Sequence, residues 1–331
     1  HLYWLFNCAW LCQAAHVAAR LDIAERLRDG PLTARELAAQ CGAQETQLLQ
    51  VLRALAGFGV FSQDAQGRFR LNAQAEPLLH NAAFSLRSYA IVWGDQLYPA
   101  AGQMLEQVRT GKTGFEVAHG QTIWNFYEHH QPESDAFDTF MSDATNLHVR
   151  SITQAYRFSQ HRRVVDVGAG RGSLITAILK ASPDLQGTWY DRPEVLPEAQ
   201  QRVAREGVSN RCELMPGNFL ESVPSGADLY VIKHVLHDWA DEPAQRIIGN
   251  IAQAMGAGSK MMIIEAVLDE RDSVDGLGKM RDLEQMFWTG GRVRTRAEFE
   301  RILAPSQLTI TKITRTPIID VCLIEIERRI G

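Results

Sequence analysis

A short apolar run, a cluster of glycines and an amphipathic segment follow one another in the middle of the chain. Residues 164–167 form a run rich in valine, which is typical of a strand buried on both faces. A G-x-G-x-G loop follows at 168–172, and residues 173–180 have apolar positions at helical spacing. A strand, a glycine loop and a helix N-terminus together expose backbone N–H groups. The pattern therefore predicts a site for a ligand with an anionic group.

The alternation of strand and helix patterns continues to the end of the chain. Further strands are predicted at 188–190, 212–215, 228–232, 260–266, 308–313 and 321–327, and helices at 192–204, 241–255 and behind a capping box at 295–298. Alternating βα units favour a parallel, doubly wound sheet, whose ligands bind at the carboxyl ends of the strands. The glycine loop, Asp191, residues 217–219 and residues 233–237 all fall at such ends, so we expect them to converge.

Helical spacing dominates the first half of the chain. One long helix is predicted over residues 2–27; its first turns are apolar all round, so it needs a large partner surface, for which a second subunit is the natural candidate. A capping box at 33–36 opens a second helix, and a third is predicted at 44–58. The apolar segments 60–61 and 69–71 then flank a polar turn as a hairpin. Three helices and a hairpin predict a winged helix.

A winged helix can serve to bind DNA or to join two subunits, and the charge of this segment decides between these roles. Between Arg20 and Leu79 there are seven Arg, no Lys and seven acidic residues, and this balance is poor for phosphate contacts. The whole chain has a net charge of −5, which also argues against a nucleic-acid partner. We therefore expect dimerisation, with a ligand-sensing winged-helix regulator as the alternative from another class.

Composition adds bounds on domains and environment. A chain of 331 residues with 45% apolar and 22% charged residues can hold two globular domains. We place a dimerisation domain at 1–90 and a second domain at 91–331, with a helical substrate cap at 91–158. Five scattered cysteines, without the spacing of a zinc site, predict free thiols, a cytoplasmic protein and no metal. No apolar run approaches the roughly 18 residues of a membrane span, so no membrane partner is expected.

The acidic residue after the second strand indicates the kind of ligand. Asp191 lies nineteen positions beyond Gly172, where a carboxylate can accept hydrogen bonds from both hydroxyls of a ribose. The dinucleotide fingerprint requires a glycine at position 173, but the chain has Ser173 there. A nucleoside ligand without a pyrophosphate, namely S-adenosylmethionine, is therefore favoured over a nicotinamide dinucleotide.

Large side chains are dense between residues 83 and 156. Most aromatic residues at helical spacing belong to a core. If the catalytic half acts on a flat aromatic substrate, some must line its pocket, and Phe137 and Met141, one turn apart, are the pair that we select. Asp282 and Met286 complete the predicted substrate contacts, with an acid on a helix surface as the alternative for Asp282.

Five segments carry a family resemblance. DVGAGRG, YDRPEV, GNF, KHVLHDWADE and GGRVRT occur in this order, and with them nearly the whole chain resembles the caffeate/hydroxyindole-type small-molecule O-methyltransferases. Bacterial members of this family modify polyketides and phenazines. The resemblance implies an α/β protein: a Rossmann-like methyltransferase domain with an N-terminal, mostly helical winged-helix dimerisation domain. It also implies a homodimer that uses S-adenosyl-L-methionine without a metal and methylates a hydroxyl of a small aromatic molecule, as in antibiotic biosynthesis.

The family motifs also imply site residues. Cofactor contacts fall on Gly168, Gly170, Asp191, Gly217, Asn218, Phe219, Lys233 and Trp239. Asn218 replaces the usual Asp, and its amide carbonyl can still accept a hydrogen bond from the adenine amino group. His237 falls on the general base, and Glu265 lies at the end of its strand where a partner carboxylate is expected, bonded to the far ring nitrogen of the histidine.

One family acid is missing. A second carboxylate beside the histidine would fall in the segment 290–295, where the chain has Val293. This departure weakens the prediction that His237 acts as a base. It leaves open a relative that binds the cofactor but has lost or changed methyl transfer.

Overall fold

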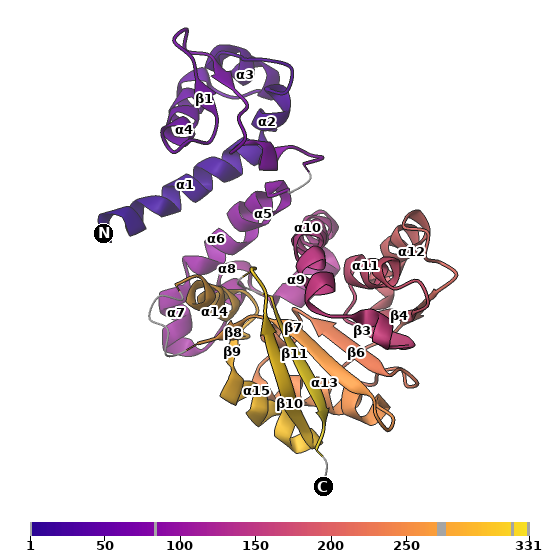
Figure 1. The fold of residues 1–331 in the computed structure, drawn as a ribbon. Coiled ribbons are helices and arrows are strands. Elements are labelled where there is room, and N and C mark those ends of the chain that lie inside the picture. The colour runs from indigo at the N-terminus through magenta and orange to yellow at the C-terminus, as the bar shows by residue number, and fades with distance from the viewer. Residues whose placement is uncertain (1, 83–84, 270–275, 319–320, 330–331) are drawn as a thin grey trace. The chain divides into compact units, whose positions relative to one another are not determined.

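Two compact units make up the chain. The computed structural model describes residues 2–82, 85–269, 276–318 and 321–329. One unit contains residues 1–102 and 124–143, and the other contains residues 103–123 and 144–331 (Figure 1). These two units are not bounded at residue 90 or residue 158. The domain boundaries predicted at those residues stay predictions.

The first unit is mainly helical, as predicted. Its elements are α1 (Leu2–Arg20), α2 (Ile23–Arg26), α3 (Ala34–Cys41), α4 (Glu45–Gly57), β1 (Ser62–Gln63), β2 (Phe69–Arg70), η1 (Glu76–Leu78), α5 (Arg87–Val92), the π-helical η2 (Trp93–Leu97), α6 (Tyr98–Ala101), nearly all of α9 (Ile123–His129) and the first half of α10 (Gln131–Ala155). Thr33 forms the predicted capping box with Glu36 at the start of α3. β1 and β2 pair as an antiparallel hairpin.

Two predictions in this unit need correction. The predicted helix over residues 2–27 ends at Arg20, because Asp22 has a left-handed φ of 52°, and a separate short helix follows. The Asp22 carboxylate accepts hydrogen bonds from Arg87, which stabilises this break. The first hairpin strand lies at Ser62–Gln63 and not at residues 60–61, where Phe61 also has a positive φ and packs into the core.

The second unit contains the seven-stranded sheet. Its elements are α7 (Met104–Thr110), α8 (Gly114–His119), the second half of α10, η3 (Phe158–Gln160), β3 (Arg163–Val167), α11 (Ser173–Ala181), β4 (Gln186–Asp191), η4 (Pro193–Val195), α12 (Leu196–Arg205), β5 (Cys212–Pro216), β6 (Leu229–Lys233), η5 (Leu236–Asp238), α13 (Asp241–Ala254), β7 (Lys260–Glu265), β8 (Val267–Leu268), α14 (Gly276–Trp288), β9 (Arg294–Thr295), α15 (Arg296–Leu303), η6 (Ala304–Ser306), β10 (Leu308–Arg315) and β11 (Cys322–Arg328). The strand order is β10-β11-β7-β6-β3-β4-β5. The predicted βα alternation is confirmed from β3 to β5 and again from β6 to β7.

Alternate residues of the central strands supply two cores. Val165 and Val167 of β3 pack on the face covered by α13 and α15. Val164 packs on the other face, with α11, α12 and the end of α10. Both faces of β3 are therefore buried, as its valine-rich sequence predicts.

The end of the sheet differs from the fully parallel arrangement that we predicted. β3, β4, β5, β6 and β7 are parallel, but β11 runs antiparallel to β7 and β10 antiparallel to β11. Only the short segment 316–321 separates β10 from β11, which is too short for a crossover helix. None of the helices in the described part of the chain has the length and apolar character needed to cross a membrane.

Candidate active site

The glycine loop between β3 and α11 is held by two neighbours in β4. Gly170 donates its N–H to Asp191 Oδ2 at 2.6 Å, and its carbonyl accepts from Trp189 Nε1 at 2.6 Å. Gly168, Gly170 and Gly172 all have positive φ, a conformation that favours glycine. A Cβ added to Gly170 would meet no atom within 4 Å, so open space lies beside the backbone there.

Gly168 marks the convergence of three loops. A Cβ added at this glycine would lie 2.7 Å from Val235 Cγ2 and 3.7 Å from Phe219 Cε1. Phe219 in turn lies edge-on to Trp239, with ring centroids 6.3 Å apart. The structure therefore brings together the loops after β3, β5 and β6, as we predicted from the strand ends.

Asp191 links two of these loops. Its Oδ1 accepts from Arg192 N at 2.7 Å, and its backbone carbonyl accepts from Gly217 N at 2.8 Å. Burial raises the pKa of the Asp191 carboxyl. The hydrogen bonds from the backbone N–H groups of Arg192 and Gly170 lower this pKa, but by less. Each carboxylate oxygen has a second lone-pair site, so Asp191 can still accept from a ribose hydroxyl.

Asn218 is exposed, and its side chain forms hydrogen bonds within the turn that follows β5. Its Oδ1 accepts from Leu220 N at 3.0 Å, and its Nδ2 donates to Glu221 Oε1 at 3.1 Å. The predicted contact with adenine stays a prediction.

Lys233 is buried at the end of β6. Its Nζ lies 3.1 Å from Thr145 Oγ1 and 3.2 Å from His234 Nδ1. The Lys233 charge lowers the pKa of the neighbouring Asp166, but burial outweighs it and raises this pKa to about 7. Lys233 therefore lies in a cluster of ionisable groups beneath the glycine loop.

His237 lies on η5, three residues beyond a strained position. His234 has a φ of 51°, which turns the chain sharply after β6. The rings of His234 and His237 stack with centroids 5.2 Å apart, and His237 Nε2 lies 3.6 Å from Asp238 Oδ1. Only 5% of His237 is exposed.

Burial sets the charge of these imidazoles. It lowers the pKa of His237 well below 6.5, and the positive charge of Arg281 adds to this effect. The pKa of His234 is lowered in the same way, by burial first and then by Lys233. His237 is therefore neutral at pH 7 and can accept a proton.

Glu265 contacts the backbone of this loop. Its Oε1 accepts from Val235 N and from His237 N, each at 3.2 Å. Among the described residues no hydrogen bond joins Glu265 to the His237 ring, so the expected contact with the far ring nitrogen is not present. Burial raises the pKa of Glu265 to about 7.

Three residues that sequence reasoning missed hold the other side of the loop. Arg294 is fully buried and donates to the carbonyls of Leu236 and Trp239, each at 2.7 Å. Arg292 N donates to the His237 carbonyl at 2.8 Å. A Cβ on Gly291 would lie 1.8 Å from that same carbonyl oxygen. All three lie in the GGRVRT segment, whose glycines and arginines are the signal in the sequence that points to them.

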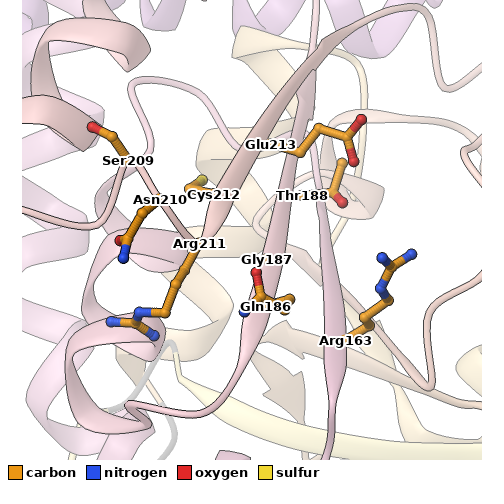
Figure 2. A pocket seen from close by; sticks show the side chains of 9 residues that line it. All are labelled: Arg163, Gln186, Gly187, Thr188, Ser209, Asn210, Arg211, Cys212 and Glu213. Atoms are coloured by element: carbon orange, nitrogen blue, oxygen red, sulfur yellow. The ribbon is translucent and has the colours of Figure 1, made fainter.

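A polar pocket of about 270 Å³ lies at the opposite end of the strands (Figure 2). It is lined by residues at the beginnings of β3, β4 and β5, including Arg163 and Cys212. Arg211, also in its wall, donates to the carbonyls of residues 179, 182 and 185. None of the predicted site residues lines this pocket, so it is separate from the site described above.

Comparisons with known proteins identify the family. The model of the O-methyltransferase domain matches residues 102–307, and that of the O-methyltransferase dimerisation domain matches residues 3–81. The chain belongs to the O-methyltransferase family. The predicted resemblance, fold class and enzyme class are thereby confirmed.

Relatives of this methyltransferase are similar over nearly their whole length. A mitomycin biosynthesis 6-O-methyltransferase from Streptomyces lavendulae is 37% identical, over 92% of this chain and 87% of the relative. A phenazine O-methyltransferase from Lysobacter antibioticus is 35% identical, over 93% and 90%. A crystal structure of an O-methyltransferase from neocarzinostatin biosynthesis, with S-adenosylmethionine and 2-hydroxy-5-methyl naphthoic acid, has a TM-score of 0.84 at 32% identity and covers 96% of each chain.

S-adenosylmethionine is the cofactor of this methyltransferase, as predicted. The glycine loop and Asp191 fit it, because the loop has open space beside Gly170 and a carboxylate beneath it. A ligand-sensing regulator, a nicotinamide enzyme and a relative without methyl transfer have no support from these relatives.

The residues predicted to contact substrate lie in different units. Phe137 and Met141 belong to the part of α10 in the first unit, where the Phe137 ring stacks on Tyr127 at 4.7 Å. Asp282 and Met286 are on α14 in the second unit. Asp282 Oδ1 accepts from Val293 N at 2.8 Å, so its carboxylate holds the turn after α14. The substrate roles of all four stay predictions.

Proposed function

We propose that this methyltransferase acts on a hydroxyl group of a small aromatic molecule, with His237 as the general base. The observation that carries the proposal is a buried, neutral imidazole on the loop that packs against the glycine loop. A neutral imidazole can take the proton of a phenol as the oxygen attacks a methyl group.

The magnitudes assign most of the catalysis to placement. A phenol has a pKa near 10 and an ordinary histidine one near 6.5, so complete proton transfer is uphill by roughly 5 kcal/mol. The lowered pKa of His237 enlarges this difference, which favours proton removal concerted with methyl transfer. Positioning can contribute about 7–11 kcal/mol, whereas a general base contributes some 10²–10⁴-fold.

When bound, S-adenosylmethionine supplies a sulfonium methyl group for an in-line displacement. The proposed cofactor contacts are those that the motifs imply: Gly168, Gly170, Asp191, Gly217, Asn218, Phe219, Lys233 and Trp239. Asp191 would accept the ribose hydroxyls, and Trp239 would border the adenine. The N-terminus of α11 would receive the carboxylate of the cofactor.

Glu265 is proposed as a positioning residue. It accepts the backbone N–H groups of Val235 and His237, so it fixes the path of the loop and, through the loop, the direction of the imidazole. This differs from a carboxylate that orients a ring nitrogen in a catalytic triad.

The proposed substrate class is a planar polycyclic phenol of secondary metabolism. The names of the relatives refer to mitomycin, phenazine and a naphthoate. Phe137, Met141, Asp282 and Met286 are the proposed contacts with such a molecule. A dimethyltransferase of 8-amino-8-demethylriboflavin is also related, at 30% identity, so aromatic amines belong in any test.

The test is methyl transfer to a defined panel. The enzyme is incubated with isotopically labelled S-adenosylmethionine and, separately, 1-hydroxyphenazine, dihydroxynaphthoates and matched aromatic amines, and the products are identified by mass spectrometry. We expect label on a phenolic oxygen. Label found only on nitrogen, or on no member of the panel or of an extract of the source organism, would contradict the proposal.

We also propose that the enzyme is a homodimer joined through its N-terminal helices. The first turns of α1 expose large apolar side chains: Leu2, Tyr3, Leu5, Phe6 and Trp10. Such a surface is typical of an interface. Deleting residues 1–12 should yield monomers or aggregates in light-scattering measurements. A truncated enzyme that remains an active dimer would contradict the role of this helix.

The cytoplasmic location expected from the cysteines stays a prediction.

A further inference from the structure

The middle of α14 has an unusual distribution of side chains. Glu284 and Gln285 are buried, whereas Met280 is 65% and Leu283 is 45% exposed. A helix on a globular protein normally buries its apolar face and exposes its charges. A buried charged residue on such a helix therefore needs an explanation in terms of a partner or a ligand.

Glu284 has only part of its hydrogen-bonding capacity used. Its Oε2 forms an ion pair with Arg281 at 2.6 Å, one turn earlier on α14. Its Oε1 is buried and has no hydrogen-bond partner among the described residues. Natural proteins rarely leave a buried carboxylate oxygen unpaired, so this atom needs an explanation such as a bound ligand.

The chain after α14 connects this helix to the proposed base. Gly290 N donates to the carbonyl of Gln285 at 3.0 Å, and Arg292 N donates to the carbonyl of His237 at 2.8 Å. The turn that closes α14 is thus hydrogen-bonded to the His237 loop. Glu284 therefore lies on the helix whose closing turn is bonded to the His237 loop.

Charge effects agree with this placement. Burial, and then the charge of Glu265, raises the pKa of Asp238, whose Oδ1 is 3.6 Å from His237 Nε2. Arg281 opposes that rise, and Glu284 adds to it. Both members of the ion pair therefore act on the residue next to His237.

The chemistry of the pair selects the group that it can bind. An ionised carboxylate only accepts hydrogen bonds, so the free Oε1 needs a donor. Since Arg281 balances the charge of Glu284, a neutral hydroxyl or amino group fits better than a cation. We infer that Glu284 determines specificity by accepting a hydrogen bond from a second hydroxyl or amino substituent of the aromatic substrate. This inference rests on the proposed function.

The test measures a selectivity ratio. Enzyme saturated with S-adenosylhomocysteine is titrated calorimetrically with 1-naphthol and with a set of dihydroxynaphthalenes, and kcat/KM is measured for the same compounds with S-adenosylmethionine. We expect the wild type to prefer at least one dihydroxynaphthalene by about 10–100-fold, the range for a hydrogen bond to a charged group. Glu284→Leu should reduce this ratio to within about threefold, and Glu284→Gln should give an intermediate ratio.

Two further variants test whether the loss of the ion pair itself changes the ratio. Glu284→Leu removes the carboxylate that pairs with Arg281, so the double variant Arg281→Met/Glu284→Leu removes both charges and should lose the preference equally. Gln285→Leu changes a buried polar neighbour on the same helix and should keep the wild-type ratio. Circular dichroism and the thermal midpoint verify that each variant is folded.

The outcomes separate the two proposals. A dihydroxynaphthalene preference that survives in the folded Glu284 variants, or a wild type without any preference, would overturn the role of Glu284. A preference in binding that depends on Glu284, in an enzyme that methylates none of these phenols, would support Glu284 and count against the proposed function instead.

Discussion

The glycine loop and the His237 loop both follow buried parallel strands of one sheet, but they are held in different ways. Gly170 is held by Trp189 and Asp191, which are 19 and 21 positions away and lie on the next strand. His237 is held by Glu265, 28 positions away, while Arg294 reaches back 58 positions to the carbonyl of Leu236. One loop is built within a single βαβ unit, whereas the other is held by two distant segments, β7 and the segment after α14.

This difference predicts which property a substitution near each loop will change. A loop held within one unit can form as soon as two strands pair. A loop held by distant groups depends on β7 and on the segment after α14, so a change in any of them moves the same imidazole. We therefore expect substitutions around His237 to affect turnover, and substitutions around the glycine loop to affect cofactor affinity.

The largest effect is expected from the imidazole itself. His237→Ala should lower kcat by about 10²–10⁴, the range for loss of a general base, with the affinity for S-adenosylmethionine preserved. Stopped assays and calorimetry give the two quantities. A variant that keeps kcat within a few-fold of wild type on an ordinary phenol would show that placement alone drives the reaction.

Gly291→Ala tests whether the distant segments position the base. Its Cβ would lie 1.8 Å from the His237 carbonyl oxygen, which belongs to backbone held on both sides and has little freedom to shift. We expect kcat to fall by about tenfold to a hundredfold, because small misplacements of catalytic groups have such effects. Gly249→Ala on α13 is the control, since its Cβ meets nothing closer than 3.8 Å. Equal kcat values for the two variants would contradict the positioning role.

Asp191→Ala sharpens the other side of the comparison. It removes the acceptor of the Gly170 N–H and the proposed ribose acceptor together, so S-adenosylmethionine binding should weaken by about 1.5–3 kcal/mol. With saturating cofactor, kcat should change much less. An unchanged dissociation constant in calorimetry would remove Asp191 from the cofactor site.

The comparison also explains which parts could be predicted from the sequence. The β3 valines, the glycines and Asp191 lie in one short segment whose pattern reports both structure and ligand, and the structure confirms this arrangement. The roles of Glu265 and Arg294 depend on which backbone groups they reach. No local pattern encodes that, so Glu265 was expected on a ring nitrogen and Arg294 was missed.

Smaller departures have equally local causes. The first helix was predicted too long because its apolar spacing continues past Asp22, whereas the left-handed φ of that residue ends the helix. The alternation of βα units predicts a parallel sheet and takes β10 and β11 into it. Direction depends on the connection between them, which is too short for a crossover.

Glu265→Gln is expected to have the smallest effect, and its signature is a dependence on pH. Burial raises the pKa of Glu265 to about 7, whereas the pKa of His237 lies well below 6.5. As pH rises through 7, Glu265 ionises and becomes a stronger acceptor for the N–H groups of Val235 and His237, while His237 remains neutral. The wild-type kcat should therefore rise a few-fold with an inflection near 7, and Glu265→Gln should lose this inflection.

The stability of the protein should fall with rising pH, whereas kcat should rise, and the fall should occur between pH 4.5 and about 7. The carboxyl binds its proton more tightly in the folded than in the unfolded chain, so its contribution to stability declines as pH rises from 4.5 to about 7. Glu265→Gln should flatten that decline by at most about 3 kcal/mol in denaturant titrations. Asp166→Asn is the matched control for the inflection in kcat, because burial also raises the pKa of Asp166 to about 7, and among the described residues no hydrogen bond joins Asp166 to the His237 loop. An inflection in kcat that persists in Glu265→Gln and disappears in Asp166→Asn would assign it to the cluster beneath the glycine loop, and would contradict the positioning role of Glu265.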